Sequence, residues 1–134
     1  MNPILRNVMA VIAGVAVGVF INGGLVQLGT GLIPSPVKVT PDNLAAIAES
    51  LHLFEPKHYI FPYLAHALGT LVGAFAAVKL SSNKHIGFGL GIGIFFLVGG
   101  ITAATMIPAQ TWFVALDLLT AYLPMGFFGW KLAK

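Results

Sequence analysis

Four long apolar stretches limit what this sequence can fold into. They cover about residues 3–28, 58–80, 85–107 and 111–132 of a chain of 134 residues. About 20 apolar residues form a helix that crosses the roughly 30 Å of hydrocarbon in a bilayer. We therefore predict an all-α fold, an integral membrane four-helix bundle. It forms a single transmembrane domain over residues 1–134 and has the lipid bilayer as its surroundings.

The composition excludes several other classes of protein. Charged residues make up only 8% of the chain and hydrophobic residues 57%, whereas soluble domains carry about 25% charged residues. A chain of this length cannot bury so much apolar surface in a small globular core. Seven scattered lysines and arginines are too few for a nucleic-acid-binding face, so no nucleic-acid partner is expected. Disulfide and thiol chemistry are excluded because the chain has no cysteine.

The first apolar stretch has an alternative interpretation as a signal peptide, because Arg6 precedes an apolar run. No small-residue cleavage motif follows that run, so we expect the segment to be retained. Asn2 as N-cap and Pro3 at the first helical position are typical of a helix start. We therefore interpret the stretch as the first membrane helix.

The connection over residues 29–57 is much longer than the others and contains a predicted surface helix. Thr40 supplies a capping hydroxyl, and Pro41 and Asp42 suit the first helical turn. Apolar residues then follow at helical spacing until Pro56 ends the helix, and they are Leu44, Ile47, Ala48 and Leu51. We expect a short amphipathic helix that caps the bundle between its first two helices.

The distribution of basic residues predicts the orientation. The connections over residues 81–84 and 108–110 are short, so neighbouring spans should be antiparallel. Five basic residues then lie on one side of the membrane and two on the other, namely Arg6, Lys79, Lys84, Lys131 and Lys134 against Lys38 and Lys57. Basic residues favour the cytoplasmic side. Both termini are therefore expected in the cytoplasm, with residues 29–57 on the extracytoplasmic side.

Rows of small residues predict where the helices meet, because close backbone contact drives helix association in lipid. Such rows occur in the first three spans, as Ala10, Gly14 and Gly18; Gly69 and Gly73; and Gly87, Gly91, Gly89 and Gly93. Packing within the bundle is the favoured interpretation, and a homo-oligomer through these glycine-rich faces is the alternative. The third span is the richest in glycine and is expected at the centre. Pro124 predicts a kink in the fourth span before Gly126.

His66 and Asp117 are the two ionisable residues well inside the predicted spans. Such groups are costly in a membrane and are a functional hypothesis by default. With Asn22 and Thr102 they give every span one polar side chain, roughly 8–12 Å below the outer ends by helical rise. Asn22 continues a row of small residues, and Thr102 follows Gly99 by three positions. We therefore expect all four side chains to face the interior and name them as candidate ligand or proton-site residues.

This polar layer has two interpretations. In the structural one, His66 and Asp117 pair with each other and fix how the helices pack. In the functional one, they form a binding or proton-relay site that opens to the outside. A cavity at this level would favour the second interpretation, and a dry, tightly packed layer would favour the first.

Metal and catalytic sites are not expected. His52, Glu55 and His58 are spaced by three, but Pro56 interrupts the helix and no compact metal-binding motif is present. The serines lie outside the spans, and none neighbours a histidine as a nucleophile and its base would. We therefore predict no metal, no cofactor and no enzymatic activity.

Three segments carry a resemblance to a known family, and they are residues 2–7 (NPILRN), residues 61–70 (FPYLAHALGT) and residues 111–113 (TWF) leading to Asp117. Together they resemble an uncharacterised family of small four-helix bacterial inner-membrane proteins. The resemblance implies a bacterial inner (cytoplasmic) membrane and no established activity.

Membership of two other four-helix membrane families is disfavoured because this chain lacks residues that those families require. Small multidrug exporters carry a glutamate in the first span, where this chain has Asn22. Membrane enzymes of eicosanoid and glutathione metabolism need an arginine-rich motif in the second span, and residues 66–70 contain no arginine. Two functional hypotheses remain: a non-enzymatic accessory or scaffold bundle, which is favoured, and a small-solute or proton-linked binding or transport protein.

Overall fold

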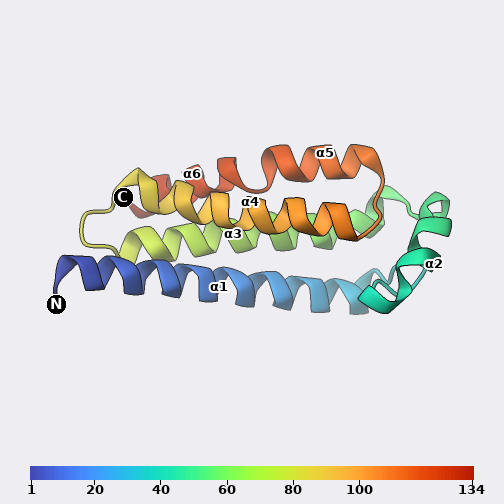
Figure 1. Cartoon of the computed structure of the whole chain (residues 1–134), viewed down its shortest axis with the longest axis horizontal. Helices are drawn as coiled ribbons and strands as arrows, with labels where there is room; N and C mark the ends of the chain where they lie inside the picture. Colours follow the sequence, from blue (N-terminus) through green and yellow to red (C-terminus); the bar gives the residue numbers. More distant parts are fainter.

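The computed structural model describes all 134 residues, and the chain is all-helical (Figure 1). Its α-helices are α1 (Pro3–Leu32), α2 (Leu44–Glu49), α3 (Ile60–Leu80), α4 (Ile86–Met106), α5 (Thr111–Thr120) and α6 (Leu123–Ala133). Short 3-10 helices precede α2 (η1, Pro41–Asn43) and follow it (η2, Leu51–Leu53; η3, Pro56–Tyr59). Both termini lie at one end of the bundle, the terminal end. Residues 33–59, which we call the cap segment, cover the other, the cap end (Figure 1).

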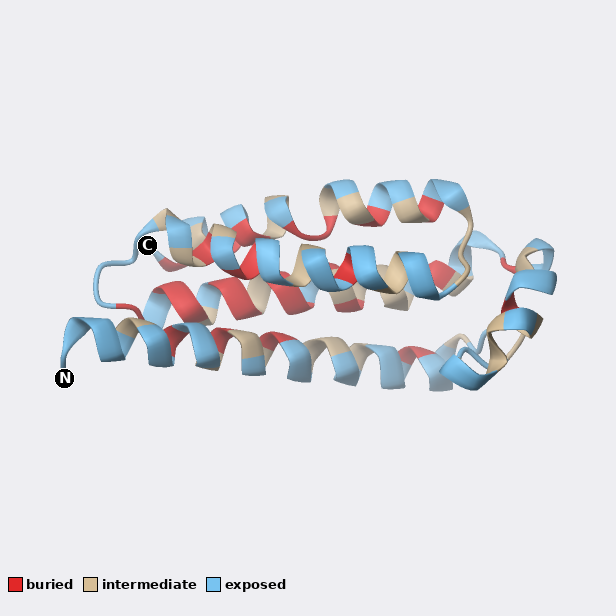
Figure 2. Ribbon diagram, viewed as in Figure 1, coloured by how far each residue is buried: buried red, intermediate tan, exposed pale blue.

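Four helical segments are long and apolar enough to cross a membrane, and they are Pro3–Leu32, Pro56–Leu80, Ile86–Met106 and Thr111–Ala133. Large apolar side chains such as Phe20 and Leu119 are exposed on the outer faces of the bundle. Figure 2 shows exposed residues along the outside of every long helix. An outer surface of this kind suits lipid rather than water. The predicted all-α four-helix bundle is therefore confirmed, as is the membrane character of its helices.

The first two spans pack through glycine. A Cβ built on Gly73 would lie 2.7 Å from the carbonyl oxygen of Gly14, and one built on Gly18 would lie 2.9 Å from that of Gly69. These distances leave no room for a side chain, so the backbones of α1 and α3 touch directly. The predicted rows on these two helices are confirmed as packing faces within the bundle.

The helix at the centre is α3, not the glycine-rich α4, so that prediction was wrong. Helix α3 packs against α1, α4 and α6, and buried residues follow its length in Figure 2. Alternate positions along a helix lie on different faces, so glycines at such positions do not form a single packing surface. In α4, Gly89 and Gly93 meet α6, whereas Gly91 and Gly99 have no other side chain or helix near them.

The fourth span is broken into two helices, which is more than the predicted kink. Proline lacks an N–H and its ring clashes with the carbonyl four residues earlier, here that of Thr120. Helix α5 therefore ends at Thr120, and α6 begins at Leu123 with Pro124 in its first turn. Tyr122 lies at the break and is only 2% exposed, with its ring against Gly100.

The predicted surface helix forms but is shorter than expected. Helix α2 has six residues and ends at Glu49, well before Pro56. The hydroxyl of Thr40 caps no backbone N–H. Ile47 is buried, whereas Ala48 is exposed, so only part of the predicted apolar stripe packs on the bundle.

Gln110, in the connection between α4 and α5, attaches the cap segment to the bundle. Its Nε2 donates to the carbonyls of Leu51 at 2.9 Å and Phe54 at 3.0 Å. The ring of Tyr59 stacks between those of Phe54 and Phe113, with centroid distances of 5.8 and 4.4 Å. These contacts hold residues 51–59 over the ends of α3 and α5.

Candidate functional site

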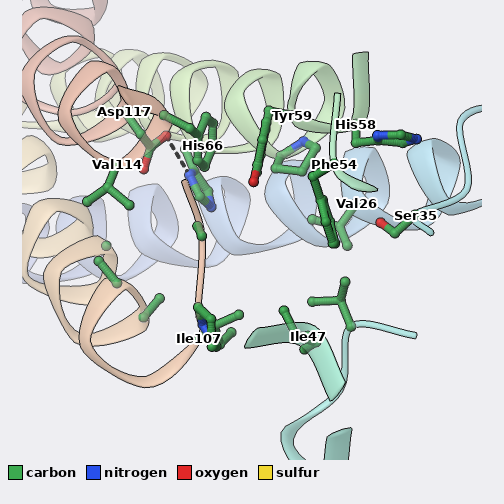
Figure 3. Close-up of a pocket in the computed structure, with 18 residues that line it drawn as sticks. Val26, Ser35, Ile47, Phe54, His58, Tyr59, His66, Ile107, Val114 and Asp117 are labelled. Carbon is green, nitrogen blue, oxygen red and sulfur yellow. Dashed lines mark hydrogen bonds and ion pairs between the residues drawn. The ribbon is translucent and has the colours of Figure 1, made fainter. Parts of the chain in front are cut away.

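Asp117 is the buried carboxylate at the centre of the site. It lies on α5 and is 5% exposed. Nδ1 of His66 lies 2.8 Å from its Oδ1, and the hydroxyl of Tyr122 donates to its Oδ2 at 3.0 Å. Both carboxylate oxygens therefore have partners, as buried polar atoms require. The predicted pairing of His66 with Asp117 is confirmed (Figure 3).

Tyr122 is the member of the site that the sequence analysis missed. In a continuous helix, side chains five residues apart point about 140° apart, so Tyr122 would face away from Asp117. The break after Thr120 turns the tyrosine back toward the carboxylate. Pro124 was the available signal, since it fixes where the helix must stop.

The two ring nitrogens of His66 have different environments. Nδ1 faces Asp117, and when that carboxyl group is ionised it only accepts hydrogen bonds, so Nδ1 is then the donor. Nε2 has no hydrogen-bond partner in the protein, and it is accessible rather than buried. The ring also stacks on Tyr122 with a centroid distance of 5.7 Å. Asp117 and Tyr122 thus fix the ring and leave Nε2 as its available atom.

His66 lines a cavity of about 250 Å³ beneath the cap segment. Figure 3 shows its ring pointing into this space, with Asp117 behind it. The wall comes from α1, α3, α4, α5 and the cap segment, and most of it is apolar; representative residues are Val26, Ile47, Phe54, Pro62, Ala104 and Val114. No lysine or arginine lines it. The polar side chains in the wall are Ser35, His58, Tyr59, His66 and Asp117. Of the two histidines, only His66 is held by a buried carboxylate.

The structure does not bring the whole predicted layer together. Asn22 is half-buried beside Gly69 at the contact between α1 and α3, but it does not line the cavity. Thr102 is exposed on α4, so its predicted inward orientation was wrong. Its hydroxyl donates to the carbonyl of Val98 at 2.8 Å. A threonine that bonds its own helix in this way satisfies its polar group without a partner helix.

The remaining polar residues of the cap end form local contacts. Nδ1 of His58 accepts from the backbone N–H of Glu55 at 2.8 Å, and Glu55 pairs with Lys57 at 3.3 Å. The structure brings no three histidine, aspartate or glutamate side chains close enough together to hold a metal ion. Tyr63 and Thr120 form a second polar contact between α3 and α5, with their hydroxyls 2.9 Å apart.

Comparison with known proteins identifies no relative: no family model, curated protein or solved structure matches this chain. The function therefore has to be inferred from the cavity and from the residues that line it.

Proposed function

We propose that this protein binds a small molecule in the cavity beneath its cap segment, with Nε2 of His66 as the recognition group. One observation carries the proposal: a histidine whose Nδ1 is held by Asp117 presents an unpartnered Nε2 to a cavity. An imidazole nitrogen that is accessible and has no protein partner can still form a hydrogen bond. A nitrogen without a protein partner at the wall of a pocket is therefore suited to a ligand.

The partners of His66 support this role because they fix its ring before a ligand arrives. A carboxylate behind a histidine sets which nitrogen carries the proton and how the ring is oriented. Asp117 has this position, and Tyr122 holds its second oxygen. A contact group that is already fixed loses little conformational entropy on binding.

Binding is favoured over transport because the polar residues end close to the cavity. Toward the terminal end, the next buried polar side chain after Thr70 is Ser81, which directly follows α3 and lies about 16 Å further along by helical rise. A proton or a polar solute has no polar residues to follow across that distance. We therefore propose that the site is accessible only at the cap end of the bundle and not from the terminal end.

Binding is also favoured over catalysis. Ser35 lines the same cavity, but no hydrogen bond joins it to His66, whose side chain pairs only with Asp117. A nucleophile and its base normally lie within hydrogen-bond reach of each other. We therefore propose a non-enzymatic protein.

The scaffold bundle that the sequence favoured remains the competing hypothesis. A dry, tightly packed layer at His66 and Asp117 would support it, and the cavity of about 250 Å³ supports binding instead. Self-association remains a proposal for α4 alone, where Gly91 and Gly99 face outward. The rows of small residues on α1 and α3 pack against each other within the bundle, so they are not available to a second copy.

We place the protein in the bacterial inner membrane with both termini in the cytoplasm. Two observations support this orientation: the termini lie at the same end of the bundle (Figure 1), and five of the seven basic residues gather there. The resemblance to small four-helix bacterial membrane proteins supports the choice of membrane.

Thermal unfolding of the purified protein with a panel of neutral, anionic and cationic small compounds tests the binding proposal. The variant His66→Asn keeps a donor near the position of Nδ1 and removes Nε2. The control Thr102→Val changes an exposed side chain in the same half of the bundle. We expect a compound that raises the unfolding temperature of the wild type and of the control but not of His66→Asn. Equal shifts in all three proteins, or no shift with any compound, would contradict the proposal.

A further inference from the structure

The charges around the cavity restrict what kind of head group it accepts. Asp117 is the only acidic residue in the wall, and no lysine or arginine accompanies it. An anionic head group would lie near a buried carboxylate, with His58 and His66 as the only side chains of the wall that can carry a positive charge, so it is disfavoured in an apolar setting. A cation has little access to Asp117, because this residue is 5% exposed and lies behind His66 and Tyr122, which bond to its two oxygens. A neutral ligand therefore suits the site best.

The hydrogen-bonding capacity of His66 narrows the head group further. With Nδ1 donating to Asp117, Nε2 is an acceptor when the ring is neutral and a donor when it is protonated. A hydroxyl group both donates and accepts, so it matches Nε2 in either state. The rest of the wall is mostly apolar and encloses only about 250 Å³, below the roughly 300–1,000 Å³ of most ligand sites. One hydroxyl on a slim apolar body fits these limits.

The rim of the cavity indicates where the ligand comes from. Three apolar residues of the wall remain well exposed: Val26 at 44%, Val39 at 46% and Ile107 at 36%. They come from α1, the cap segment and the end of α4, so the mouth lies between α1 and α4. Closer to the terminal end the two helices are in contact, because Phe96 lies against Gly18. Ser35, which is also exposed, adds one polar side chain to this rim. A mouth whose rim is mostly apolar and lies between two membrane helices opens toward lipid.

From these three observations we infer that the ligand is a neutral, membrane-dissolved amphiphile with one hydroxyl group. The hydroxyl bonds to Nε2 of His66, and the apolar body extends between α1 and α4 toward the leaflet at the cap end. The inference rests on the proposed function and specifies its ligand class and its route.

Four probes that share a ten-carbon chain test the head group: 1-decanol, decane, decanoate and decylammonium. Unfolding temperatures are measured in phosphatidylcholine nanodiscs for the wild type, His66→Asn and the control Thr102→Val, so that general effects on the bilayer cancel. We expect 1-decanol to stabilise the wild type and the control. Loss of one hydrogen bond should weaken its binding to His66→Asn by about 3- to 10-fold.

The outcomes separate the two proposals. If decanoate or decylammonium stabilises the protein in a His66-dependent way and 1-decanol does not, the hydroxyl class is wrong while a binding site remains. If decane stabilises all three proteins as well as 1-decanol does, the cavity binds chains without using His66, and both proposals fail. If no probe changes the unfolding temperature, the amphiphile inference fails. The broader compound panel then decides the binding proposal.

The route is tested with a bulky residue at the rim. Val26→Trp narrows the mouth, and Ile101→Trp is the matched control because Ile101 is exposed on α4 and does not line the cavity. We expect Val26→Trp to raise the concentration of 1-decanol needed for half-maximal stabilisation by about tenfold, equivalent to about 1.4 kcal/mol, and Ile101→Trp to leave it unchanged. Phenol is the water-soluble hydroxyl probe. Access from the membrane is refuted if Val26→Trp leaves 1-decanol unaffected, or if phenol stabilises the protein through His66 and 1-decanol does not.

Discussion

Removing the hydroxyl of Tyr122 perturbs the site with little change of shape. Tyr122→Phe keeps the ring that packs against Gly100 and deletes only the donor that lies 3.0 Å from Oδ2 of Asp117. Tyr122 is 2% and Asp117 5% exposed, so water has little access to replace the lost partner. The measured effect should therefore report the hydrogen bond and the cost of leaving a carboxylate oxygen unpartnered.

The size of this effect follows from the environment of the bond. Hydrogen bonds to charged groups contribute about 1.5–3 kcal/mol in proteins, whereas those between membrane helices average about 0.6 and reach about 1.7 kcal/mol. The Tyr122 bond is buried and, with Asp117 ionised, it is also charge-assisted, which places it at the upper end of the membrane range. We expect Tyr122→Phe to lower the free energy of unfolding by about 1–2 kcal/mol.

The assay is reversible unfolding in mixed micelles with increasing fractions of denaturing detergent. Tyr63→Phe is the matched control, because it deletes a hydroxyl that pairs with the neutral hydroxyl of Thr120. Thr120 also donates to the carbonyl of Leu116, so it keeps a partner in the variant. We expect a smaller loss in the control. If Tyr122→Phe costs no more than Tyr63→Phe, the proposed role of Tyr122 in holding Asp117 is wrong.

Three further predictions concern packing, the cap segment and orientation. Gly73→Leu should destabilise the bundle by about 2 kcal/mol or more, because a Cβ there would lie 2.7 Å from a backbone oxygen. Gly99→Leu should be tolerated, because a Cβ at Gly99 meets open space. The same unfolding assay compares the two variants. Gln110→Ala removes two hydrogen bonds to the cap segment and should speed its cleavage in limited proteolysis with little loss of bundle stability; unchanged cleavage would refute the role of Gln110. Because the chain has no cysteine, Glu49→Cys should react with an impermeant thiol reagent on intact bacterial cells and Lys134→Cys only after permeabilisation. The reverse pattern would invert the orientation.

The sequence was sufficient to predict the spans and the pairing of His66 with Asp117, because both depend on properties of the residues themselves. An apolar stretch of about 20 residues has few alternatives to a membrane helix. Two ionisable side chains at a similar depth have a strong reason to meet, since each is costly alone in lipid. His66 and Asp117 illustrate this, with 2.8 Å between Nδ1 and Oδ1.

Other features depend on which way each helix face turns, and that is set by the assembled bundle. Thr102 was expected to face inward, but a hydroxyl that bonds its own helix gives no preference between lipid and interior. The sequence likewise did not indicate which glycines of α4 contact a neighbouring helix. The cavity is lined by residues of α1, α3, α4, α5 and the cap segment, so no local pattern predicts it.

Nitrogen NMR of histidine side chains in lipid bilayers tests the central claim most directly. The signals of His66 are identified as those lost in His66→Asn, and 1-decanol is then added to the wild-type sample. We expect the Nε2 resonance of His66 to shift on addition of 1-decanol, with a much smaller change at Nδ1, which stays bonded to Asp117. If the Nε2 resonance does not move while 1-decanol stabilises the protein, His66 is not the recognition group and the proposed binding mode is wrong.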